Sequence, residues 1–108
     1  MLWRVRKVSE RKEVFIRVEA IDSETGEPIA FARVELWKDA RVKGGKIVAS
    51  KAEPDYVGST DADGIASFRV EPGYYVVALK SQMWSPVAKE VEITSDGVIT
   101  IKSVKAFV

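Results

Sequence analysis

Apolar and polar residues alternate along most of the chain with a period of two residues. The alternation runs through residues 14–20, 32–36, 66–70, 75–79 and 91–93. A period of two places successive side chains on opposite faces, so each stretch predicts a β-strand with one buried face. No stretch of useful length shows the apolar stripe of an amphipathic helix. The pattern therefore predicts an all-β domain.

Turn-forming residues separate the predicted strands. They cluster at 22–28, 61–64, 71–73 and 95–97, and each cluster contains a glycine. We expect hairpin turns at 61–64 and 95–97, and at 61–64 the glycine can supply a positive φ without steric cost. Seven or eight short strands, spaced by about 8–12 residues, favour an antiparallel sandwich or barrel.

The phase of the alternation within each strand predicts which residues form the core. A shift of one residue would turn every side chain of a strand to the other face, so the phase is a strong constraint. The predicted core consists of Ile16, Val18, Ala32, Val34, Leu36, Phe68, Tyr75, Val77, Leu79, Val91, Ile93, Ile99 and Ile101.

Two segments stand apart from this pattern. Residues 38–51 are polar and basic and contain Gly44 and Gly45, which predicts a long loop holding a short strand at 47–49. Residues 1–12 form an N-terminal arm ahead of a single sandwich domain over 13–108. The arm contains Leu2, Trp3, Val5 and Val8, and it could add a strand to an open sheet edge. The alternative is a frayed leader that contacts nothing.

Two runs of residues carry a resemblance to known domains. The first is Val18-x-Ala20-x-Asp22-x-x-Thr25-Gly26-x-Pro28-Ile29-x-x-Ala32-x-Val34-x-Leu36. The second is Thr60-Asp61-Ala62-Asp63-Gly64-x-Ala66-x-Phe68-x-Val70-x-Pro72-Gly73-x-Tyr75-x-Val77. In order and spacing, the chain resembles carboxypeptidase regulatory-like and Cna B-type domains over about residues 14–104.

The resemblance implies an antiparallel Greek-key sandwich of about seven strands, transthyretin-like in fold. It also implies a stalk, spacer, adhesion or accessory role. Many Cna B domains carry a Lys–Asn isopeptide bond, which this chain cannot form because it has no asparagine. A rarer Lys–Asp bond is not indicated by any feature of the sequence. Transthyretin-related hydrolases use histidines, and this chain has none.

Composition excludes several chemistries. With no cysteine and no histidine, the chain lacks a thiolate nucleophile, the usual proton shuttle and the commonest transition-metal ligands. Asp61 and Asp63 could begin a calcium loop, but the further ligands of such a loop are missing, so we expect them to cap a turn. We therefore predict a protein that is not an enzyme, with no catalytic residue, metal or cofactor.

Lys and Glu number ten each, there is no asparagine, and Gln82 is the single glutamine. This composition is typical of hyperthermophile proteins. The formal net charge of +1 gives no general reason to expect nucleic acid as a partner. No apolar run is long enough to span a bilayer.

Basic and aromatic residues mark the candidate partner-binding positions. Basic residues gather in the long loop, and we expect Trp37, Tyr56, Tyr74 and Trp84 to be exposed. The basic cluster could meet an acidic partner, although a solvated surface explains it as well. The candidate set is Trp3, Trp37, Tyr56, Trp84, Arg41, Lys43 and Lys46.

These observations leave two functions open. The first is a non-catalytic structural or protein-interaction module, acting through a protein partner or self-association. The alternative is an accessory domain that binds carbohydrate through exposed aromatic rings. The resemblance favours an extracellular or cell-surface location, whereas residues 1–12 contain no signal-peptide apolar region.

Overall fold

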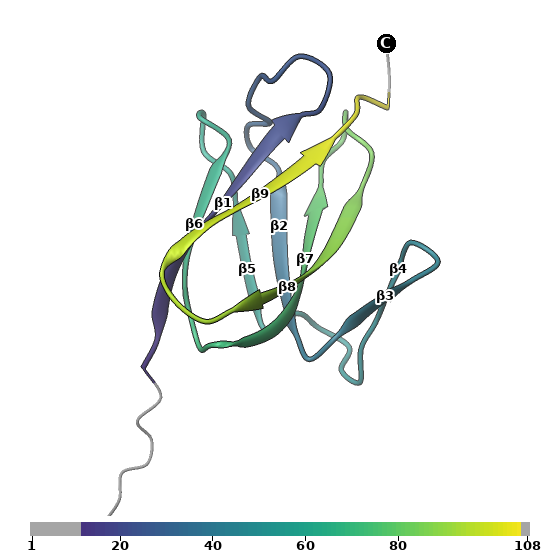
Figure 1. The fold of residues 1–108 in the computed structure, drawn as a ribbon. Helices are drawn as coiled ribbons and strands as arrows, with labels where there is room; N and C mark the ends of the chain where they lie inside the picture. Colours follow the sequence, from purple (N-terminus) through teal and green to yellow (C-terminus); the bar gives the residue numbers. More distant parts are fainter. Residues whose placement is uncertain (1–11, 107–108) are drawn as a thin grey trace, which may run out of the picture.

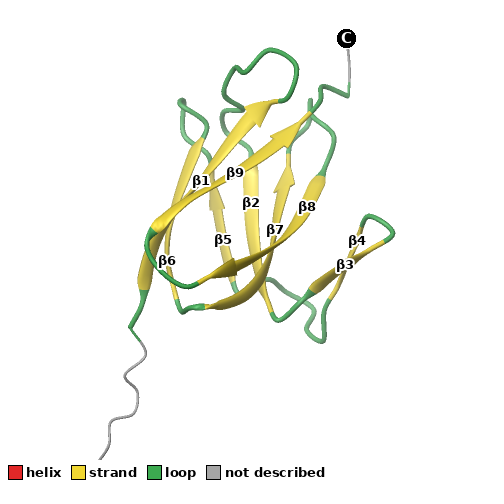
Figure 2. Cartoon of the chain, in the orientation of Figure 1, coloured by secondary structure: helices red, strands yellow, loops and turns green. Residues whose placement is uncertain are grey.

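The computed structural model describes residues 12–106, in which nine β-strands and no helix are found (Figures 1 and 2). None of the described chain could therefore cross a membrane as a long apolar helix. The strands are β1 (Val14–Asp22), β2 (Arg33–Lys38), β3 (Arg41–Lys43), β4 (Lys46–Val48), β5 (Tyr56–Ser59), β6 (Ile65–Val70), β7 (Gly73–Lys80), β8 (Val87–Ile93) and β9 (Gly97–Ser103).

Seven of these strands form two sheets that face each other as a sandwich (Figure 1). The smaller sheet has the order β6-β1-β9 and the larger one the order β5-β2-β7-β8. The strands β3 and β4 pair as a separate hairpin, so residues 38–51 hold two short strands rather than the single predicted one. The all-β prediction is confirmed.

One strand pair corrects the prediction of an antiparallel sandwich. β1 and β9 pair in parallel, with Ile16 beside Gly97 and Asp22 beside Ser103. The turn between β8 and β9 crosses from the larger sheet to the smaller one. It ends beside the first residues of β1, where Gly97 is the partner of Ile16. From that point β9 can only run alongside β1 in the same direction. The other strand pairs are antiparallel.

The predicted hairpin turns at 61–64 and 95–97 are also corrected. Each joins a strand of one sheet to a strand of the other, so its flanking strands do not pair. Glycine and aspartate favour a tight turn both in a hairpin and in a crossing between sheets. The sequence therefore does not distinguish the hairpin from the crossing. The expected local role of Asp61 is confirmed, because its Oδ1 accepts hydrogen bonds from the amides of Asp63 and Ile65 at 2.9 and 3.0 Å.

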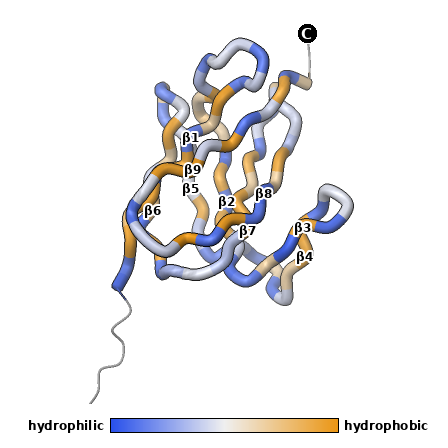
Figure 3. Tube along the Cα trace, viewed as in Figure 1, coloured by the Kyte–Doolittle hydropathy of each residue, from blue (hydrophilic) through white to orange (hydrophobic). Residues whose placement is uncertain are grey.

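The core lies between the two sheets and follows the predicted phase. Apolar and polar residues alternate along its strands (Figure 3). Phe68, Val91 and Ile99 are half-buried and pack against the core, while the rest of the predicted set is buried. Val76 and Ala78 were not predicted to be buried, because they face outward from β7. Their burial means that other residues cover part of the outer face of the larger sheet. The predicted arm, 1–12, lies outside the described residues except for its last residue.

Candidate interaction surface

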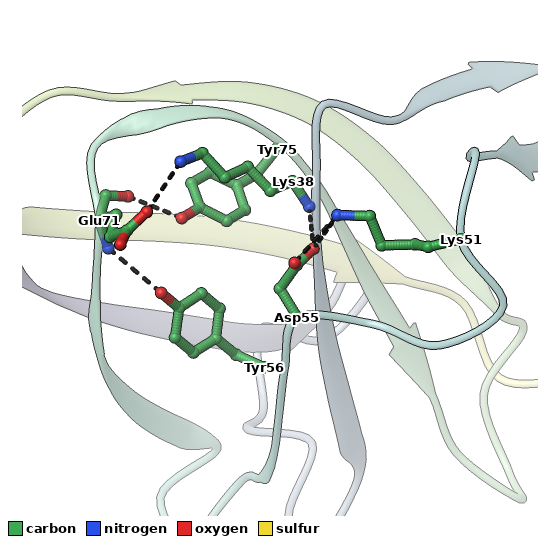
Figure 4. Close-up of polar contacts among 6 residues, drawn as sticks. All are labelled: Lys38, Lys51, Asp55, Tyr56, Glu71 and Tyr75. Atoms are coloured by element: carbon green, nitrogen blue, oxygen red, sulfur yellow. Dashed lines mark hydrogen bonds and ion pairs between the residues drawn. The ribbon is translucent and has the colours of Figure 1, made fainter.

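The chain between β2 and β5 is fixed to the larger sheet at its base. Lys38 donates its amide to Oδ2 of Asp55 at 2.7 Å, and the ammonium of Lys51 contacts both oxygens of the same carboxylate at 2.9 Å (Figure 4). Asp39 donates its amide to the carbonyl of Tyr74 at 2.7 Å. These contacts hold both ends of the segment, so the β3–β4 hairpin projects from a defined base.

Tyr56 begins β5, directly after Asp55, and makes a separate set of contacts with Glu71 and Tyr75. Its hydroxyl oxygen accepts the amide of Glu71 at 3.3 Å, and its ring lies 6.2 Å from that of Tyr75 (Figure 4). The hydroxyl of Tyr75 donates to the carbonyl of Glu71 at 2.7 Å. Burial raises the pKa of Tyr75 well above its ordinary value, so the hydroxyl stays protonated. Tyr56 is half-buried here, rather than exposed as predicted.

A groove of about 440 Å³ separates the β3–β4 hairpin from the outer face of the larger sheet. Trp37 and Lys46, two of the predicted partner-binding residues, line it together. Lys51 and Lys80 add positive charge, and Ala78, Val87 and Ala88 form an apolar floor. The groove therefore combines a half-buried indole with ammonium groups.

A buried carboxylate organises the side chains at the edge of this groove. Glu35 is 3% exposed although it faces outward from β2. It accepts hydrogen bonds from Trp37 Nε1 at 3.0 Å and from Arg33 Nε at 2.7 Å, and Lys80 Nζ lies at 3.3 Å. Burial on its own raises the pKa of Glu35, but the contacts with Arg33, Trp37 and Lys80 together outweigh it, so the pKa falls below its ordinary value. The carboxylate holds Trp37 in place.

A second groove, of about 410 Å³, lies at the end of the larger sheet where β7 begins. Tyr74 is 62% exposed beside it, as predicted, and pairs with Glu92 on β8. Asp39 and Glu90 also line the groove, and Arg41 is its one basic lining residue. Oε2 of Glu90 accepts the amide of Val42 at 2.8 Å, which ties the hairpin to β8. This surface is acidic with an aromatic centre.

The other predicted partner-binding residues are dispersed. Lys43 is exposed at the tip of the β3–β4 hairpin. Trp84 is half-buried in the loop after β7, where its Nε1 donates to Asp22 Oδ2 at 3.0 Å and Lys105 Nζ lies 5.3 Å from its ring centre. Trp3 lies outside the described residues. Trp37, Tyr56 and Trp84 thus occupy separate places and do not form a shared aromatic platform.

Asp22, an acidic residue of the turn cluster at 22–28, contacts both its own turn and a distant side chain. Its Oδ1 accepts the amides of Glu24 and Thr25 at 2.8 and 3.1 Å, while Oδ2 accepts the indole of Trp84. The hydrogen bond from Trp84, followed by that from the amide of Glu24, lowers the pKa of Asp22. Within residues 12–106, no group of three or more acidic side chains is arranged to hold a metal ion.

Sequence reasoning missed Phe31, Glu35 and Met83. Phe31 is 78% exposed and Met83 is 49% exposed, and both line a third groove with Lys80 and Trp84. A signal existed for two of them, since Phe31, Arg33 and Glu35 share the phase opposite to the core residues of β2. The phase predicts an outward direction, but it does not predict that Glu35 is buried there.

Comparison with known proteins supports the fold. A scan against protein-family models finds no match, and neither does a search of curated proteins. Among solved structures, the group B streptococcus pilus 2b backbone protein matches 88% of the chain with a TM-score of 0.67 and 16% identity. The Bacillus cereus major pilin subunit BcpA matches 88% with a TM-score of 0.62 and 17% identity.

An enzyme shares the same fold. The 3-chlorocatechol 1,2-dioxygenase of Rhodococcus opacus 1CP matches 94% of the chain with a TM-score of 0.65 and 10% identity. The chain spans 42%, 31% and 63% of the length of the backbone pilin, BcpA and the dioxygenase, so less than two thirds of each. At these identities the similarity shows the shared β-sandwich fold alone, so function must be argued from the surface.

Proposed function

We propose that this chain is a non-catalytic structural module that works through protein–protein contacts, as a spacer, surface or assembly domain. The observation that carries the proposal is the pair of exposed aromatic side chains on a hydrogen-bonded backbone, Phe31 and Tyr74. Aromatic residues are enriched at protein interfaces and often provide their anchoring contacts. The sandwich shared with two pilus subunits supports the same role.

Further parts of the proposal rest on resemblance and composition. The pilin neighbours favour an extracellular or cell-surface location. The carboxypeptidase regulatory-like label, the Greek-key connection and a thermophilic source stay predictions. Residues 1–12 are proposed to add an edge strand used in assembly. Edge strands bound both sheets, namely β5 and β8 in the larger one and β6 and β9 in the smaller one.

The proposal is tested by measuring the mass of the full chain in solution over a hundredfold range of concentration, alongside a glycan array. A mass that rises with concentration, with no glycan bound, is the expected result. A chain that remains monomeric and binds a defined glycan through Trp37 would instead establish the carbohydrate-binding function. In that case Trp37→Ala would abolish glycan binding.

A further inference from the structure

Phe31 lies in a backbone conformation that is unfavourable for its type. Its φ is +58°, in the left-handed region, where a bulky side chain is rare and costly. The side chain gains little from packing in return, because 78% of it is exposed. A glycine or asparagine would satisfy the backbone better. The stability of the isolated chain therefore does not account for a phenylalanine at position 31.

Thr60 holds the backbone on both sides of Phe31. The amide of Phe31 donates to the carbonyl of Thr60 at 3.0 Å, and the amide of Ala32 donates to Thr60 Oγ1 at 2.8 Å. The same hydroxyl donates to the carbonyl of Ile29 at 2.7 Å, and Thr60 is buried. The ring of Phe31 is thus presented to solvent from a fixed loop, which lowers the entropy cost of using it in a contact.

The surroundings of Phe31 form an apolar surface with a basic edge. We call Phe31, Arg33, Lys80, Met83 and Trp84 the Phe31 surface; with their neighbours they line a groove of about 620 Å³. Arg33 and Lys80 both contact the buried carboxylate of Glu35, at 2.7 and 3.3 Å. Trp84 contacts the buried carboxylate of Asp22, and the ammonium of Lys105 lies over its ring. The three cations exceed the two carboxylates by one positive charge.

A complementary surface lies at the other end of the same strand. We call Tyr74, Asp39, Glu90 and Glu92 the Tyr74 surface; it has an exposed aromatic ring, three carboxylates and one cation, Arg41. β7 begins at Gly73, next to Tyr74, and ends at Lys80, so the two surfaces lie at opposite ends of the larger sheet. One surface is basic and the other acidic, and each presents an aromatic ring.

We propose that the Phe31 surface of one copy of this chain binds the Tyr74 surface of a second copy. This inference rests on the proposed function and specifies the surfaces involved. The contact joins two different surfaces, so it is head-to-tail and leaves a free surface at each end of the pair. Opposite charges steer the two ends together and the aromatic rings supply the apolar contact. Each surface consists of only a few side chains, so the interface is small and the association is weak. The association is also salt-dependent because opposite charges contribute to it.

The test uses sedimentation velocity on the full chain at concentrations up to about 1 mM, since small interfaces bind weakly. The variants are Phe31→Asn, which suits the left-handed backbone, and Tyr74→Thr, which suits a strand. Phe15→Thr is the matched control, since Phe15 is 58% exposed on the smaller sheet. We expect Phe31→Asn and Tyr74→Thr each to lose association about tenfold or more, with the control unchanged. Phe31→Asn should unfold at the wild-type temperature or above.

Mixing the two variants identifies the contact. Tyr74→Thr keeps an intact Phe31 surface and Phe31→Asn keeps an intact Tyr74 surface, so an equimolar mixture should form pairs that neither variant forms alone. Wild-type protein that stays monomeric overturns the inference and the self-association in the proposed function together. Wild-type association that both variants retain, or a mixture that does not pair, overturns the inference and leaves the proposed function standing.

Discussion

At the scale of single residues, most of the local chemistry could be predicted from the sequence. Asp61 caps its own turn, and the alternating phase identifies the core. The exceptions share a physical cause, because a partner from a distant part of the chain overrides the local pattern. Trp84 is half-buried since its indole reaches Asp22, which lies 62 residues away in sequence. Glu35 is buried because two side chains contact its carboxylate: that of Arg33, two residues earlier on β2, and that of Lys80 on β7.

Glu35 gives a prediction for acid stability. Its pKa is lowered in the folded chain, so its contribution to stability is complete above the ordinary pKa of 4.5 and is lost as the pH falls below that value. Glu35→Gln should lower the free energy of unfolding at pH 7 by about 1–2 kcal/mol, because hydrogen bonds to a charged group are lost. The variant should also lose less stability than wild type between pH 5 and pH 3, measured by urea unfolding.

The exposed Glu24 provides the control for this measurement. Glu24→Gln should change the free energy of unfolding at pH 7 by no more than about 0.5 kcal/mol. If Glu35→Gln matched the wild-type stability at pH 7 and declined in parallel with it in acid, the carboxylate would not hold its three partners as described.

At the scale of elements, strand positions could be predicted and strand partners could not. β1, β2, β6 and β7 lie within a residue or two of their expected positions. The turn residues before β6 and β9 predict a change of direction, but the same residues serve a hairpin and a crossing between sheets. For this reason the parallel pairing of β1 with β9 was beyond local reasoning.

The corner where β5 meets β6 gives a prediction at this scale. The two strands belong to different sheets, and the ring of Phe68 fills the space above Gly58. A Cβ at position 58 would lie 3.0 Å from two atoms of that ring, closer than the ring tolerates without shifting. Gly58→Ala should therefore lower the free energy of unfolding by about 1–3 kcal/mol, as overpacking does.

A second variant separates the steric effect from other effects of the alanine. In the Phe68→Leu background, the shorter side chain leaves room, so Gly58→Ala should cost less than it does in the wild type. Equal costs in the two backgrounds, measured by thermal unfolding, would contradict the account of this corner.

At the scale of the whole molecule, the fold class could be predicted, whereas the grooves of the candidate interaction surface could be predicted only in part. Trp37, Lys46, Tyr74 and Arg41 do line grooves on the larger sheet. Phe31 was missed because its proposed role depends on a backbone conformation held by hydrogen bonds to Thr60, 29 positions away in sequence. The contact between Phe31 and Thr60 depends on the completed fold.

The proposed role of the N-terminal arm gives a prediction for the molecule. Removing residues 1–11 should lower the melting temperature or reduce the number of subunits in the assembly, because an added edge strand satisfies backbone groups at the edge of a sheet. If the truncated chain keeps both the melting temperature and the oligomeric state of the full chain, the arm is not an assembly strand.

The most direct test of the account is an NMR dilution series of the unmodified chain, followed at every backbone amide. Head-to-tail association predicts concentration-dependent shifts at residues 31–33, 74, 80–84 and 90–92, and these shifts should shrink when salt is added. The outer face of the smaller sheet, including Phe15 and Val98, should not respond. Spectra that are independent of concentration up to about 1 mM, a range suited to weak interfaces, would contradict the account, as would shifts confined to the smaller sheet.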